Sequence, residues 1–173
     1  MIYGDFPEEW RTAIIIPIHK KGDRNNPDNY RGVSLLNTGY KIYSKIIAMI
    51  LTVIAEVLIL EEQNWFRKGR SCMDCIFSAS QIIEKHREFN IPTYAAFIDF
   101  KKVFDSVDRD KLRTIMSNKG IPTHLITAIQ KTYMKNIIRV NAGNRISEDF
   151  RVITQGVRQG CPLSPVLFNL YLD

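Results

Sequence analysis

The apolar segment Thr93–Asp99, TYAAFID, constrains the fold of this chain most strongly because it ends in an aspartate. A short run that is apolar on both faces predicts a strand in the middle of a sheet. The carboxylate of Asp99 is then expected where the strand leaves the sheet, a place where ligands and metals bind. Taken alone, this aspartate fits two roles, capping of the following turn or coordination of a hard cation such as Mg²⁺.

Two more carboxylates follow a few residues later. Asp105 and Asp108 lie in DSVDRDKL, a pattern typical of the start of a helix. We therefore expect Asp105 or Asp108 to be the N-cap of that helix and not a metal ligand.

Apolar spacing and turn-forming residues predict the other elements of an α+β fold. Strands at Ala13–His19 and Tyr30–Leu36 flank a basic, turn-rich segment and should form a hairpin. Ser71, followed three residues later by Asp74, predicts a capped helix start. The remaining predictions are helices at Thr38–Leu60, Ser71–Phe89, Asp108–Lys119, Thr123–Met134 and from Pro165 onward, and an antiparallel pair of strands at Ile137–Asn141 and Asp149–Ile153.

The charge of the chain favours a polyanionic partner. Lysine and arginine outnumber aspartate and glutamate by 24 to 18, and the excess is concentrated in HKKGDR and FRKGR. An ordinary solvated basic surface would give the same composition, so charge alone leaves both interpretations open.

Cysteine usage argues against a disulfide scaffold. The chain has three cysteines, of which only Cys72 and Cys75 are close in sequence. Their spacing is that of half a zinc knuckle, but no second Cys/His pair follows, so we interpret them as thiols in a reducing compartment.

The segment Ile46–Leu60 is strongly apolar but is shorter than the roughly 20 residues that a membrane span needs. It also contains Glu56 and follows Lys41 and Lys45. A buried helix is therefore predicted and no membrane partner is expected. The N-terminal segment has no signal-peptide pattern.

The loop Gln155–Pro165 combines glycines, which let a ligand approach the backbone, with Arg158 and the start of a helix. Such a loop can contact phosphates or a base pair. It lacks the spacing and the Lys-Ser/Thr pair of a P-loop, so it is not a nucleotide-triphosphate loop of that class.

Four motifs, in this order, resemble reverse transcriptases of non-LTR (LINE-type) retrotransposons: NYRGVSLLN, QNWFRKGRSCMD, FIDFKKVFDSV and RQGCPLSPVLFNLYLD. The resemblance covers about residues 6–173. It implies a partial right-hand polymerase, with a mostly antiparallel sheet and packed helices. Residues 1–92 would be fingers-like, and residues 93–173 a partial palm with fingers-side helices.

The resemblance assigns metal chemistry to Asp99. This residue matches the first catalytic aspartate, and the backbone carbonyl of Phe100 would face the same Mg²⁺ or Mn²⁺. Phosphoryl transfer from a dNTP to a primer 3′-OH uses two such ions, which one carboxylate cannot hold. The family supplies the other carboxylates from a Tyr/Phe-Ala-Asp-Asp hairpin, and no such motif occurs in these 173 residues.

The resemblance also assigns substrate and nucleic-acid contacts. Arg31 matches an arginine that reaches the triphosphate, with Lys20 or Lys21 as its basic companion. Phe104 matches the residue that disfavours a ribose 2′-OH. Gln159 and Gly160 match a loop beside the template and nascent base pair. Contacts with an RNA template and DNA primer are expected from Gln63, Arg67, Lys68, Arg70 and Arg158.

Some positions depart from the family pattern: Trp65 replaces a glycine, Val103 an alanine, Gly32 a proline and Ile50 a helix arginine. These changes and the missing Asp-Asp motif predict a chain that is inactive in isolation, truncated before the catalytic hairpin. The alternatives are a non-catalytic nucleic-acid-binding remnant of a decayed element, or a product without a stable fold. The resemblance implies an intracellular protein of the cytoplasm and nucleus.

Overall fold

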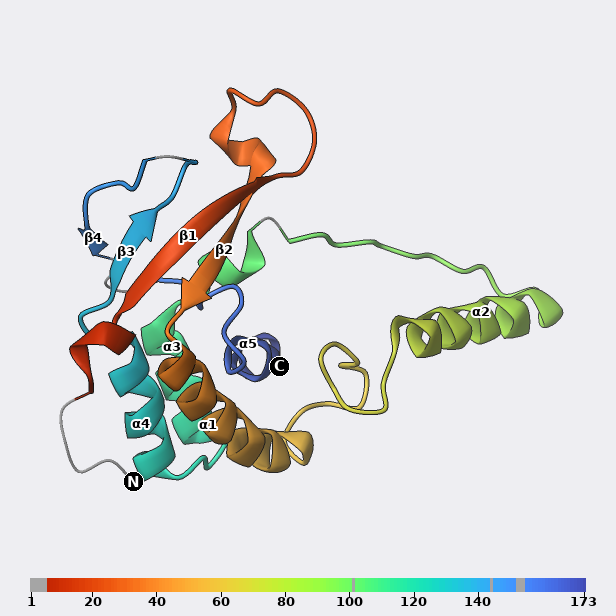
Figure 1. The fold of residues 1–173 in the computed structure, drawn as a ribbon. Coiled ribbons are helices and arrows are strands. Elements are labelled where there is room, and N and C mark those ends of the chain that lie inside the picture. Colours follow the sequence, from red (N-terminus) through yellow and green to blue (C-terminus); the bar gives the residue numbers. More distant parts are fainter. Residues whose placement is uncertain (1–5, 101, 144, 152–154) are drawn as a thin grey trace.

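The computed structural model describes residues 6–100, 102–143, 145–151 and 155–173. These residues form a body of four helices and one sheet, from which a helical arm projects (Figure 1). The α+β class is therefore confirmed. The elements are β1 (Thr12–His19), β2 (Tyr30–Leu36), α1 (Thr38–Glu56), α2 (Cys72–Glu88), α3 (Arg109–Asn118), α4 (Thr123–Tyr133), β3 (Ile137–Val140), β4 (Phe150–Arg151) and α5 (Ser164–Leu172).

The sheet has the order β2-β1-β3-β4. The predicted hairpin is present, since β1 pairs antiparallel with β2, from Ala13 opposite Leu36 to His19 opposite Tyr30. The predicted antiparallel pair is also present, as β3 and β4, although residues 152 and 153 of its second strand lie outside the described residues. Between them, β1 and β3 are parallel, with Thr12 opposite Ile137. This parallel pairing was not predicted, and it joins the part of the chain predicted as fingers to the part predicted as palm.

The core lies between the sheet and the helices α1, α3, α4 and α5. Helix α5 runs through its centre (Figure 1), and Leu167 and Leu170 are completely buried there. Tyr40 and Leu51 of α1 are buried to the same degree. Each such side chain contributes roughly 1.5–3 kcal/mol by leaving water, so these contacts hold the body together.

Helix α1 starts at Asn37, whose side-chain oxygen accepts hydrogen bonds from the backbone N–H groups of Gly39 (2.8 Å) and Tyr40 (3.4 Å). One face of the helix is buried, while Ile46, Val53 and other apolar residues on the opposite face are exposed. By length and composition alone, α1 could cross a membrane. The helix begins at Thr38, so it is longer than the apolar segment Ile46–Leu60 that the sequence analysis considered. The buried face accounts for α1 as a core helix.

The predicted strand at Thr93–Asp99 is absent, so this prediction is wrong for the described structure. Residues 91–100 run as an extended, unpaired segment from α2 back to the body (Figure 1). Their side chains are exposed, with Tyr94 at 91% and Phe97 at 97%. A strand needs a neighbouring strand with which it exchanges backbone hydrogen bonds. No described strand pairs with residues 93–99.

Two predicted helix starts are confirmed. Asp108 is the N-cap of α3 and accepts hydrogen bonds from the N–H groups of Asp110 (2.9 Å) and Lys111 (3.0 Å). Ser71 and Asp74 form a reciprocal capping box at the start of α2. Helix α2 is fully formed although every residue of its surface is exposed or half-buried, so local capping defines it more than packing does.

The central position of α5 leads to the first prediction. Leu167→Ala should lower the free energy of unfolding by about 3 kcal/mol, because it opens a cavity where α5 meets its neighbours. Val53→Ala on the exposed face of α1, where the side chain is 74% exposed, should change it by less than about 0.5 kcal/mol. Urea unfolding of both variants measures the difference, and equal effects would contradict this core.

Candidate functional site

The glycine-containing loop that precedes α5 folds back onto β2. The Ser34 N–H donates a hydrogen bond to the Gln159 carbonyl (2.9 Å). Gly160 has a φ of 101°, and a Cβ added to it would lie 3.1 Å from the Ser34 carbonyl oxygen. A side chain at this position would therefore meet both backbone strain and a close contact, which explains the glycine.

This docking brings three distant motifs together at the surface. Arg31 Nε on β2 donates to Gln159 Oε1 (3.1 Å), and Gln159 Nε2 donates to Asp105 Oδ1 (3.1 Å). We call Arg31, Gln159 and Asp105 the polar cluster. All three side chains are solvent-accessible, so the cluster presents a cation, an amide and a carboxylate to a ligand.

Phe104 lies at the base of the polar cluster. Its ring packs against Phe168 of α5 at 5.1 Å between centroids and against Phe66 at 6.2 Å. Its carbonyl accepts a hydrogen bond from the Val157 N–H (2.7 Å). Phe104, which is predicted to face the sugar of a nucleotide, therefore packs against the core and is half-buried.

The turn that contains Lys102 and Phe104 is fixed to the β1–β2 hairpin by an ion pair that the sequence analysis missed. Lys102 Nζ lies 2.6 Å from Asp28 Oδ1, 74 residues earlier in the chain. The hydrogen bond to Asp28 raises the pKa of Lys102. No local pattern could have revealed this pair, because it depends on how the hairpin lies over the turn.

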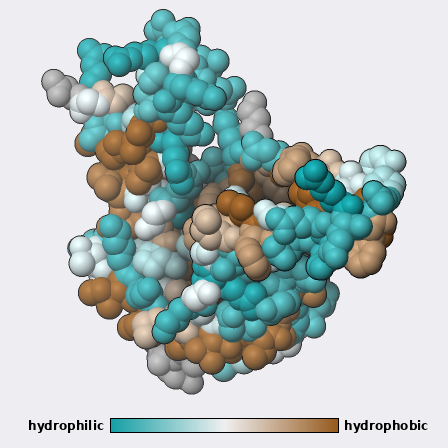
Figure 2. Space-filling view, turned by 90° about the vertical axis from the view of Figure 1, so that its right-hand side faces the viewer, coloured by the Kyte–Doolittle hydropathy of each residue, from teal (hydrophilic) through white to brown (hydrophobic). Residues whose placement is uncertain are grey.

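Lys20 and Lys21 are exposed at the tip of the β1–β2 hairpin. The tip is ordered by its own backbone, since the Lys20 N–H donates to the Asn29 carbonyl (2.8 Å) and Gly22 adopts a φ of 85°. The space-filling view shows this upper end as almost entirely hydrophilic (Figure 2). The two lysines therefore extend from a formed hairpin into solvent.

Asp99 and Phe100 lie at the end of the exposed segment 91–100. Within the described ranges, Asp99 makes no hydrogen bond or ion pair, and no group of three or more His, Cys, Asp or Glu side chains could hold a metal ion. The structure thus brings Arg31, Phe104, Gln159 and Gly160 together but does not bring Asp99 into a set of metal ligands.

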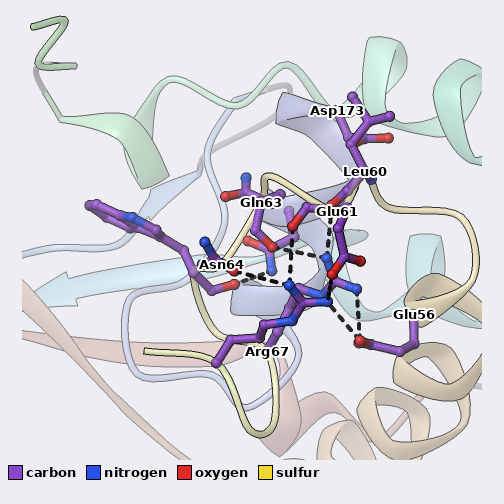
Figure 3. Close-up of polar contacts among 10 residues, drawn as sticks. Glu56, Leu60, Glu61, Gln63, Asn64, Arg67 and Asp173 are labelled. Carbon is purple, nitrogen blue, oxygen red and sulfur yellow. Dashed lines mark hydrogen bonds and ion pairs between the residues drawn. The ribbon is translucent and has the colours of Figure 1, made fainter. Parts of the chain in front are cut away.

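Arg67 has an internal role rather than the predicted nucleic-acid contact. Its guanidinium donates to Glu56 Oε1 from Nε (3.1 Å) and Nη2 (2.8 Å), and from Nη1 to the carbonyls of Leu60 (2.8 Å) and Gln63 (3.0 Å) (Figure 3). The Arg67 side chain is only 4% exposed. The hydrogen bond to Glu56 raises its pKa. It therefore fastens the turn after α1 to that helix.

Arg70 is held in the same turn. Its guanidinium bonds the Glu61 carboxylate and, at 3.4 Å, Asn64 Oδ1. Lys68, between the two arginines, is exposed, and Gln63 takes part through its carbonyl. Among the predicted contacts in this motif, Lys68 has the accessibility that a phosphate ligand needs.

Asp173 accepts a hydrogen bond from the Leu60 N–H in this turn (2.7 Å; both residues are labelled in Figure 3). It also accepts one from Lys119 Nζ (2.5 Å). Burial alone would raise the pKa of its carboxyl, but these two bonds hold the pKa below its usual value.

Arg158 is buried, which also differs from its predicted role. Its guanidinium stacks 4.7 Å from the centre of the Tyr40 ring and donates to Asn136 Oδ1 (2.5 Å) and the Arg11 carbonyl (3.3 Å). Burial raises the pKa of the Tyr40 hydroxyl, so the arginine faces a neutral ring. Arg158 thus holds the glycine loop against α1 and the start of β1.

Comparison with known proteins places this fold and site in a family. The family model described as reverse transcriptase (RNA-dependent DNA polymerase) matches residues 18–173. The chain therefore belongs to the reverse transcriptase family, as its motifs predicted.

Relatives from transposable elements cover almost all of this chain. It is 30% identical over 172 residues to the probable RNA-directed DNA polymerase from transposon BS of Drosophila melanogaster, and 28% identical over 171 residues to the Pol polyprotein of the type-2 retrotransposable element R2DM of the same fly. It is also 28% identical over 172 residues to an uncharacterized 149 kDa protein of transposon TX1 from Xenopus laevis. These matches cover 96%, 98% and 98% of the chain but only 18%, 16% and 13% of those relatives.

The contrast between buried and exposed cations gives the second prediction. Arg67→Ala should lower the free energy of unfolding by about 2 kcal/mol, because two carbonyls and the Glu56 carboxylate lose their donor. Lys68→Ala, one residue away and exposed, should leave stability within about 0.5 kcal/mol. Chemical denaturation of the two variants checks this, and an unaffected Arg67→Ala protein would refute the internal role.

Proposed function

We propose that this chain forms the nucleotide-facing part of an RNA-directed DNA polymerase, within a longer protein that completes the catalytic site. The polar cluster supports this most directly. It joins Arg31 from the hairpin, Asp105 from the motif after Asp99, and Gln159 from the glycine loop, which are three motifs far apart in sequence. Their common surface is of the kind that a triphosphate and a base pair need.

Each member of the site then has a role that its geometry supports. Arg31 carries a permanent charge at the surface, suited to the oxygens of an incoming dNTP, and Lys20 or Lys21 extends from the hairpin tip above it. Gln159 and Gly160 form a narrow backbone surface beside the nascent base pair. Phe104, fixed by Phe168, supplies a rigid wall against a ribose 2′-OH.

The metal chemistry needs groups beyond the described residues. Asp99 and the Phe100 carbonyl are oxygen ligands of the kind that Mg²⁺ or Mn²⁺ prefers, and Asp99 is unengaged within the described ranges. One carboxylate is too few for two ions, and no described cluster supplies the rest. The described residues by themselves therefore do not make up a two-metal site, and the isolated chain is proposed to be inactive.

The unpaired segment 91–100 fits the same proposal. Its apolar residues are suited to a strand covered on both faces, and it ends at Asp99. In the longer protein, a neighbouring Asp-Asp hairpin would pair with this segment and bring further carboxylates to Asp99. Residues 1–92 and 93–173 would then be parts of the fingers and palm, acting on RNA template and DNA primer in the cytoplasm and nucleus.

Primer extension on a poly(rA)/oligo(dT) hybrid with dTTP and Mg²⁺ or Mn²⁺ tests the polymerase proposal. A protein extended with the element's sequence beyond Asp173 should extend the primer, whereas the 173-residue chain should not. Asp99→Asn in the extended protein should lower the rate by at least about 100-fold, because the metal loses a charged ligand.

The matched control is Asp110→Asn, which alters an exposed carboxylate in the first turn of α3 and should leave the rate unchanged. Primer extension by the 173-residue chain itself would overturn the proposed dependence on further carboxylates. An Asp99→Asn protein of normal activity would overturn the role of Asp99.

A second candidate function is nucleic-acid binding without catalysis. The exposed cations Lys20, Lys21 and Arg31 near the hairpin, together with a net charge of +6, support it. Binding of this kind weakens steeply as salt rises, because phosphate neutralisation releases counterions.

Salt dependence tests this candidate. A Lys20→Ala, Lys21→Ala double variant should bind an RNA/DNA hybrid more weakly, and the slope of log affinity against log salt should flatten by about 2. Lys131→Ala alters an exposed lysine on α4, a helix that lies away from the hairpin tip (Figure 1), and should behave like the unmodified chain. Fluorescence anisotropy at several salt concentrations measures this, and the absence of binding at low salt would exclude the candidate.

A further inference from the structure

Helix α2 begins with two thiols, and none of the functions above uses them. Cys72 is its first helical residue and is exposed, while Cys75 lies three residues later and is half-buried. Residues three apart lie side by side on a helix surface. The third thiol, Cys161, is buried in the core, where the Tyr40 hydroxyl lies 3.4 Å from its sulfur. The chain therefore separates one accessible pair of thiols from one protected thiol.

Cys75 is held by a directed hydrogen bond. Asn64 Nδ2 donates to Cys75 Sγ at 3.0 Å, while Asn64 Oδ1 accepts from Arg70 Nη1 at 3.4 Å. Arg70 thus fixes the orientation of the amide, so that its NH₂ group faces the sulfur. This hydrogen bond therefore fixes the Cys75 sulfur in the first turns of α2, three residues from Cys72.

One charged side chain lies beside the pair. Asp74 lies between the two cysteines, but its carboxylate already accepts hydrogen bonds from the Ser71 N–H (2.7 Å) and Ser71 Oγ (3.1 Å). Its charge is therefore partly satisfied by the cap. Within the described ranges, no third His, Cys, Asp or Glu joins the thiols in a group that could hold a metal ion.

Disulfide closure needs only a small local adjustment. Helix neighbours three apart have Cβ atoms roughly 5–6 Å apart, whereas a disulfide needs about 3.8 Å. Cys72 is at the first helical position, where backbone N–H groups have no partner within the helix, so this turn can tighten at low cost. The side chains around it are exposed or half-buried, and no tight packing opposes the movement.

We propose that Cys72 and Cys75 form a site for reversible thiol–disulfide exchange with low-molecular-weight disulfides such as glutathione disulfide. The exposed Cys72 thiolate attacks one sulfur of glutathione disulfide, whose S–S bond breaks and releases one glutathione thiolate. The Cys75 thiolate, whose sulfur is positioned by Asn64, then attacks Cys72 Sγ and displaces the second glutathione. The two cysteines are oxidised, glutathione disulfide is reduced to two glutathione molecules, and these take up the two thiol protons.

The test treats the folded 173-residue chain with glutathione disulfide, blocks free thiols with iodoacetamide and digests the protein with trypsin. Both cysteines lie in the peptide spanning residues 71–85, and Cys161 lies in another peptide. We expect the first peptide to lose two hydrogen atoms and to regain them with dithiothreitol. The Cys161 thiol should remain unmodified in the native protein and react only after unfolding.

Two variants separate this mechanism from simple exposure of thiols. Cys75→Ser should accumulate a glutathione adduct on Cys72 and form no internal disulfide. Asn64→Asp keeps an oxygen acceptor for Arg70 but removes the donor to Cys75, so ring closure should slow by about threefold and the Cys72 adduct should accumulate transiently.

Protection of Cys161 and an unchanged circular dichroism spectrum verify that each variant is folded. The proposal is overturned if the unmodified chain gains glutathione on both cysteines without an internal disulfide, or does not react. An Asn64→Asp protein that closes at the normal rate would remove Asn64 from the mechanism.

Discussion

The packing of α5 against the other helices is the contact on which the remaining structure depends. Leu167 and Leu170 are completely buried, and Phe168 lies against Phe104, so one helix joins the core to the candidate site. The loop that enters α5 carries Gln159 and Gly160 to β2. The candidate site is therefore supported by core residues, and on the proposed function this supported side is the one that faces a nucleotide.

Two buried arginines extend this arrangement. Arg158 fixes the glycine loop by stacking on Tyr40, and Arg67 fixes the turn after α1 through Glu56 and two carbonyls. The acceptors around Arg67, and the two acceptors and the aromatic ring beside Arg158, offset part of the cost of removing a cation from water, although Arg158 Nη1 has no hydrogen-bond partner among the described residues. Both arginines lie in motifs that the chain shares with a polymerase family, yet their bonds are internal. Membership in a binding motif and contact with the ligand are thus different properties.

The sequence predicted those parts of the fold that short-range physics determines. Helix periodicity, the Ser71 and Asp108 caps and the antiparallel strand pairs depend on residues close together in the chain, and these predictions agree with the structure. The parallel pairing of β1 with β3 was missed because it joins strands more than a hundred residues apart without a local signal. The burial of Arg67 and Arg158 was missed because the sequence does not show whether the partner of an arginine is a phosphate or a backbone carbonyl.

The failed strand at Thr93–Asp99 shows why intrinsic preference is insufficient for a β-strand. A helix such as α2 forms its backbone hydrogen bonds within itself, so it is stable even on an exposed arm. A strand forms its backbone hydrogen bonds only with a neighbouring strand. Phe97 and Ile98 are therefore exposed, and Asp99 belongs to no group of three or more metal-ligating side chains among the described residues. On the proposed function, the packed body holds the residues that face a substrate, while the position of Asp99 depends on strands that would pair with segment 91–100. On the proposed function, strand pairing and assembly of the metal site are then one event, because the backbone bonds that order this segment also fix the aspartate at its end.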